Sequence, residues 1–99
     1  MPLDVTTRGM VEEWIEFCIS EKMLAGYVEK AKDLHRKGFM DSIPSFVYGI
    51  IYQSTQDTFF TWIRKYNREP TRSEVVEFMR IFSERSYVIK SRISQATNL

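Results

Sequence analysis

Basic side chains in the last third of the chain are the residues best suited to binding chemistry. Five of them follow Pro70, namely Arg72, Arg80, Arg85, Lys90 and Arg92. Arginine and lysine bind phosphates, and they also contact guanine edges. Residues 62–99 carry eight basic and four acidic side chains (net +4), whereas residues 1–61 carry six basic and nine acidic ones (net −3). This asymmetry indicates an anionic partner or the acidic half of another copy, although a solvated face with a chance bias explains it equally well.

Residue types that serve catalysis or metal binding are scarce. His35 is the single histidine and Cys18 the single cysteine, so neither an internal disulfide nor a multi-cysteine metal site can form. Complementing the negative end of a helix explains His35, and an apolar helix stripe explains Cys18 as a small hydrophobe. The four glycines are scattered and form no phosphate-binding loop. We therefore expect no enzyme, no metal, no cofactor and no small-molecule substrate.

Composition predicts one globular domain over residues 1–99. The chain is 43% hydrophobic and 27% charged, which argues against disorder. No segment with basic residues leads into an apolar run at the N-terminus, and the richest apolar stretch, IPSFVYGIIY, is far shorter than a membrane span of about 20 residues. We expect a soluble, cytoplasmic protein that does not enter a membrane.

Apolar spacing of three and four residues predicts an all-α protein, a compact bundle of about four helices with no sheet. The first helix should begin after Thr6 or Thr7, and Gly38 should close the second in a left-handed conformation. The polar run QSTQDT is a candidate for a kink or a break in the third helix. Whether the first two helices are separate stays open, because no breaker precedes Gly26. The expected helices cover approximately 7–21, 23–37, 43–66 and 72–96.

The entrance to the last helix carries a capping box. Pro70 ends the preceding segment, Thr71 caps the new helix, and Glu74 reaches back to the N–H of the cap. This motif accounts for the local structure without any functional role.

The same stretch resembles part of a known DNA-binding motif. Residues 59–75, FFTWIRKYNREPTRSEV, resemble the entry to the helix-turn-helix of LexA-type repressors and related winged-helix regulators, in which Pro-Thr-x-x-Glu and an apolar residue open a helix. The residues REPT..E are also similar to the start of a helical region in bacterial sigma factors. The resemblance implies a small regulator that binds double-stranded DNA, with a turn near 83–85 and a recognition helix over 86–95. The implied DNA-binding residues are Arg72, Arg80, Arg85, Tyr87, Lys90, Ser91 and Arg92.

A second pattern in the same region favours assembly instead. Apolar or small residues recur at alternating steps of four and three from Val75 to Ala96, and neither glycine nor proline follows Pro70. This pattern favours one continuous helix over 72–97, about 39 Å long, which would overhang the domain and invite a protein partner or a second copy. DNA binding requires a bend between Phe82 and Tyr87, and a homodimer is compatible with either interpretation. The partner-binding residues of this alternative are Val75, Met79, Phe82, Ile89 and Ile93.

Overall fold

The computed structural model describes residues 3–98, and these residues form five helices joined by short loops. No strand occurs within these residues, so the predicted all-α class is confirmed. The number of helices differs from the expected four because the last one divides at Arg85. In chain order the helices are α1 (Val5–Cys18), α2 (Glu21–Arg36), α3 (Ile43–Arg64), α4 (Arg72–Glu84) and α5 (Ser86–Thr97).

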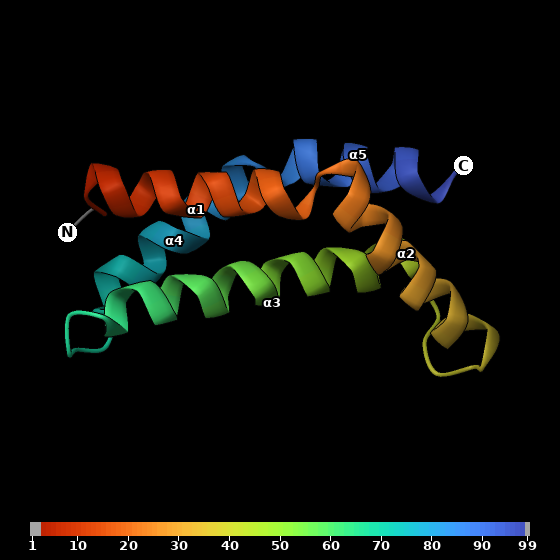
Figure 1. Cartoon of the computed structure of the whole chain (residues 1–99), viewed down its shortest axis with the longest axis horizontal. Helices are drawn as coiled ribbons and strands as arrows, with labels where there is room; N and C mark the ends of the chain where they lie inside the picture. Colours follow the sequence, from red (N-terminus) through yellow and green to blue (C-terminus); the bar gives the residue numbers. More distant parts are fainter. Residues whose placement is uncertain (1–2, 99) are drawn as a thin grey trace.

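The longest helix, α3, organises the bundle, since it contacts each of the other four. Figure 1 shows α1 running antiparallel to α3 along one half of the molecule, with α4 behind them. At the other half, α2 descends across the beginning of α3, and α5 continues along the edge occupied by α1. The molecule is elongated, with extents of 42 × 23 × 20 Å.

The start of α1 differs from the prediction. Asp4, rather than Thr6 or Thr7, caps the helix, and its Oδ1 accepts a hydrogen bond from the Thr7 N–H at 2.7 Å. Thr7 is buried inside the first turn, where its hydroxyl accepts a hydrogen bond from Trp62 Nε1 at 3.1 Å. Helices α1 and α2 are separate and are joined only through Ile19 and Ser20.

Helix α3 is continuous through QSTQDT, so the break considered there does not occur. The threonine hydroxyls of this run bond to backbone carbonyls of the same helix. Thr55 donates to the Ile51 carbonyl at 2.7 Å and Thr58 to the Ser54 carbonyl at 2.9 Å. The capping box of α4 is confirmed, since Thr71 and Glu74 exchange both expected hydrogen bonds.

The predicted left-handed residue after α2 is also confirmed, because Gly38 has a φ of +77°. Replacing Gly38 by alanine should lower the free energy of unfolding by about 1 kcal/mol, since a side chain is strained in this conformation. Gly49→Ala is the matched control. Gly49 lies inside α3 and no atom would contact an added Cβ, so this variant should be more stable by about 0.5 to 1 kcal/mol. Chemical denaturation checks both signs, and equal effects at the two positions would contradict the backbone argument.

One apolar core runs the length of the bundle. Toward the end formed by α1, α3 and α4, the rings of Phe59 and Phe78 stack with centroids 4.9 Å apart. Tyr52 adds an edge contact to Phe82. Toward the other end, Val28 of α2 and Ile89 and Ile93 of α5 belong to the same buried cluster.

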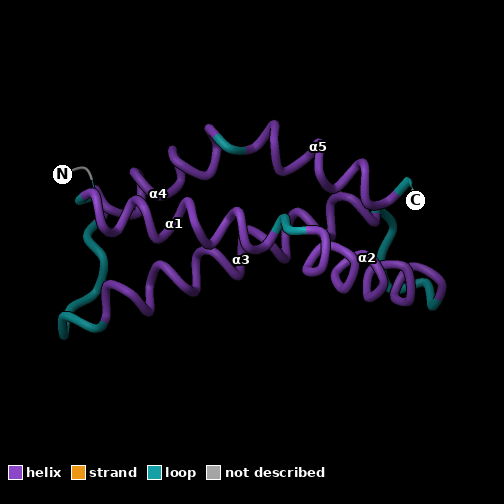
Figure 2. The backbone as a smooth tube through the Cα atoms, turned by 45° about the horizontal axis from the view of Figure 1, so that its top comes forward, coloured by secondary structure: helices purple, strands orange, loops and turns teal. Residues whose placement is uncertain are grey.

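The division between α4 and α5 is a bend of one residue, so the prediction of one continuous helix over 72–97 is wrong. Arg85 keeps a right-handed conformation (φ −90°, ψ −1°), and its N–H still bonds to the Ile81 carbonyl at 3.2 Å. Figure 2 shows the resulting arch of α4 and α5 over the rest of the bundle. The bend brings Ile89 and Ile93 into the core, where they are 0% and 1% exposed, and we expect their burial to outweigh the interrupted helix.

Candidate interaction surface

The outward side of α4 and α5 carries a stripe of exposed residues that crosses the bend. Within each helix, successive members are three or four positions apart, which places them on one face of that helix. We call this set the outer stripe, and its members are Arg72, Val76, Met79, Ser83, Tyr87 and Lys90.

The middle of the outer stripe is apolar although it faces solvent. The exposed fractions are 57% for Val76, 50% for Met79 and 83% for Tyr87. Single exposed apolar residues are ordinary, but two on α4 and a third just beyond the bend form a surface that gains free energy when it is covered.

The acidic residues of α4 are all engaged in ion pairs. Glu74 receives two hydrogen bonds from Arg68, at 2.8 and 2.9 Å, while Arg80 lies between Glu77 and Glu84 and pairs with both. The pKa of Glu74 is lowered to about 2, chiefly by the Arg68 guanidinium and further by the Thr71 N–H. Helix α5 contains no acidic residue.

Two of the arginines expected to bind DNA form ion pairs with glutamates of the same chain. Arg80 is paired as described above, and Arg85 pairs with Glu16 of α1. The Arg85 Nε is buried and finds no hydrogen-bond partner among the described residues, so this side chain is turned into the seam with α1. Among residues 3–98, no ion pair involves Arg72, Lys90 or Arg92.

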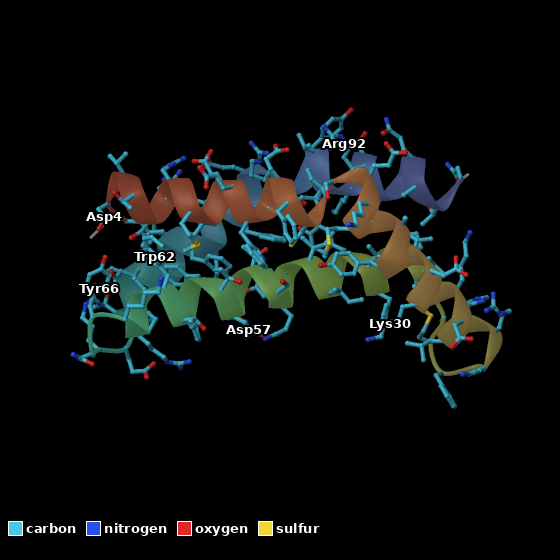
Figure 3. All side chains as sticks on the ribbon, in the orientation of Figure 1. Asp4, Lys30, Asp57, Trp62, Tyr66 and Arg92 are labelled. Carbon is cyan, nitrogen blue, oxygen red and sulfur yellow. The ribbon has the colours of Figure 1, made fainter. Side chains whose placement is uncertain are left out.

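The unpaired cations of α5 lie on opposite flanks of the helix. The Lys90 ammonium lies 5.6 Å from the centroid of the Tyr48 ring, beside a groove of about 550 Å³ between α5 and the start of α3. Arg92 lines a second groove, of about 490 Å³, between α5 and α2, and Figure 3 places it on the edge of the molecule away from α3. Tyr87 projects into solvent and Ser91 is half-buried. The structure therefore does not gather the seven predicted DNA-binding residues into one continuous basic patch.

Ser86, the first residue of the recognition helix that the resemblance implies, contacts α3. Its Oγ lies 3.0 Å from the Tyr48 hydroxyl, and the start of α5 has no side-chain cap. This hydrogen bond ties α5 to α3 directly after the bend.

The apolar stripe predicted for partner binding is mostly internal. Phe82, Ile89 and Ile93 are at most 3% exposed, and Val75 packs against the core while half-buried. Only Met79 is freely exposed among the five. The sequence patterns did not single out Val76 or Ser83 as exposed residues of the outer stripe. The available signal was Val76, an apolar residue directly next to Val75 of the predicted apolar stripe.

Residues 3–98 offer little support for a reactive thiol, a metal site or a membrane-spanning helix. Burial raises the pKa of the Cys18 thiol, which disfavours the reactive thiolate. No group of three or more His, Cys, Asp or Glu side chains in this range is arranged to hold a metal ion. None of the described helices has the length and apolar character needed to cross a membrane.

Comparison with models of known protein families, with curated proteins and with solved structures finds no match to this chain. The capping box of the LexA-type resemblance is present, but the resemblance itself stays a prediction.

Proposed function

We propose that this protein is a protein-interaction module that binds another protein through the outer stripe of α4 and α5. The observation that carries the proposal is the solvent exposure of Val76, Met79 and Tyr87 on one face. Tyrosine and methionine are enriched at the centres of protein interfaces, where tyrosine supplies a rigid contact and methionine adapts its shape to the partner.

The support beneath the outer stripe is held by contacts to α1 and α3, which favours binding without a large ordering cost. Phe78 and Phe82 anchor α4 through aromatic contacts to α3. Arg85 and Ser86 fix the bend through Glu16 and Tyr48. Exposed side chains on such a support are already held near one another before a partner arrives.

DNA binding is the second candidate, and one observation favours it. Helix α5 begins at Ser86, where the resemblance requires a recognition helix to begin. Two observations weigh against it. A helix-turn-helix joins its helices by a turn of three or four residues, whereas a single residue separates α4 from α5. In addition, the ion pairs of Arg80 and Arg85 reduce the positive charge available to phosphates.

A site-specific photocrosslinker distinguishes the two candidates. Placed at Ser83, between the apolar residues of the outer stripe, it should yield a protein adduct of defined mass in cells that express the chain. The matched control position is Asp57, which is exposed on the opposite edge of the molecule and should yield none (Figure 3). Val76→Ser combined with Met79→Ser should abolish the Ser83 adduct while leaving the circular dichroism spectrum unchanged.

The opposite results are equally specific. Absence of a Ser83 adduct together with binding to duplex DNA would favour the DNA-binding alternative. That binding should weaken steeply as salt rises and should fall when Arg72 and Lys90 are replaced by alanine.

A further inference from the structure

On the basis of the proposed function, we infer that the segment bound by the outer stripe is an acidic amphipathic helix. Three features support this inference. They are the positive charge at both ends of the stripe, the helical backbone beneath it, and the repulsion between like charges when two copies face each other.

Charge defines the ends of the stripe. Arg72 and Lys90 flank its apolar middle, and neither forms an ion pair with another described residue. The acidic side chains nearest to them in α4 are already paired with Arg68 and Arg80. A partner that carries carboxylates beside an apolar face would therefore find both cations without a competing carboxylate in this chain.

Self-association through this face is electrostatically disfavoured. Arg72 and Lys90 are equally far along the sequence from residue 81, which is the midpoint of the stripe. An antiparallel second copy centred on that midpoint would place Arg72 of each chain opposite Lys90 of the other. A parallel copy would place each cation opposite its own equivalent. Both arrangements turn like charges toward one another at the two ends of the stripe, which costs free energy.

The secondary structure of the support restricts the conformation of the partner. A strand binds by adding itself to a free sheet edge, and the outer stripe lies on helices whose backbone groups are bonded internally. A helical partner suits such a surface, because a helix satisfies its own backbone groups without help from the support. From Val76 to Tyr87 the apolar middle spans about 16 Å, which is about three helical turns.

Three designed helical peptides of about 18 residues test the charge and the apolar face together. All share one leucine face, and the flanking positions hold glutamate, glutamine or lysine. Binding to the intact chain is measured by fluorescence anisotropy. The glutamate peptide should bind most tightly, and Arg72→Glu with Lys90→Glu should weaken it at least about tenfold while strengthening the lysine peptide. Lys22→Glu with Lys30→Glu is the control of equal charge on α2, and it should leave all three affinities within about twofold.

Each other result overturns a different statement. Equal binding of the glutamate and glutamine peptides would overturn the acidic character of the partner. Failure of all three peptides, combined with a Ser83 crosslink to a protein, would overturn the helical acidic partner and retain the interaction module. Peptide binding that survives Val76→Ser with Met79→Ser would place the site elsewhere and would overturn both proposals.

Discussion

Phe78→Ala is expected to lower the free energy of unfolding by about 3 to 5 kcal/mol. Phe78 is fully buried, stacks on Phe59 at 4.9 Å and also contacts Tyr52 and Phe82. Truncation removes the transfer free energy of the ring and leaves a cavity between α3 and α4. Since domains of this size are stable by only about 5 to 15 kcal/mol, this loss is a large part of the total, and the variant should unfold at a markedly lower denaturant concentration than the natural chain.

Phe39→Ala is the matched control for this substitution. Phe39 is 74% exposed in the loop between α2 and α3, so its truncation should change the free energy of unfolding by less than about 0.5 kcal/mol. Similar losses at positions 39 and 78 would mean that the aromatic contacts between α3 and α4 do not form in solution.

Glu74→Gln is expected to make the protein less stable near neutral pH by about 1 kcal/mol, because the Arg68 side chain is 46% exposed and water screens the ion pair. The Glu74 side chain is only 13% exposed, and Arg68 holds its pKa at about 2 instead of 4.5. Glutamine retains an oxygen that can accept from the Thr71 N–H, so the substitution removes the charge and largely preserves the capping box.

The sign of the pH dependence follows from the lowered pKa. Above about pH 4.5 Glu74 is ionised in both states, and the Arg68 pair contributes fully to stability. As the pH falls from about 4.5 toward 2, the unfolded chain takes up a proton that the folded chain does not, and the contribution is lost. The difference between the natural chain and Glu74→Gln should therefore shrink over this range in denaturation curves recorded at successive pH values.

Glu29→Gln controls for a general effect of removing a carboxylate, because Glu29 is exposed on α2 and forms no ion pair among the described residues. A difference between the natural chain and Glu74→Gln that stayed constant from about pH 7 to pH 3 would show that the Arg68 pair does not lower the pKa of Glu74.

The contacts of Phe78 and Glu74 also position the proposed binding surface. Phe78 sets the distance of α4 from α3, and Glu74 fixes the first turn of the same helix to the preceding loop. Both residues point away from the outer stripe, so conservative changes at Val76 or Met79 should alter binding with little effect on stability. This separation makes the interaction proposal testable without unfolding the protein.

Local patterns in the sequence determined the helices and several of their ends. Apolar spacing identified the helical segments, Gly38 ended α2 in a left-handed conformation, and Thr71 with Glu74 opened α4. These features depend on contacts within a few residues along the chain, so the amino-acid order alone specifies them. The burial of Cys18 followed in the same way from its place on an apolar stripe.

Only the tertiary structure decided the bend at Arg85 and the direction in which α4 and α5 face. The apolar pattern continues across the bend without glycine or proline, so nothing local interrupts the helix. The interruption is fixed by partners distant in sequence, Glu16 for Arg85 and Tyr48 for Ser86, and by the burial of Ile89 and Ile93. Which apolar residues become core and which become surface depends on where the neighbouring helices lie, and this is why Phe82 is buried while Val76 and Met79 face solvent.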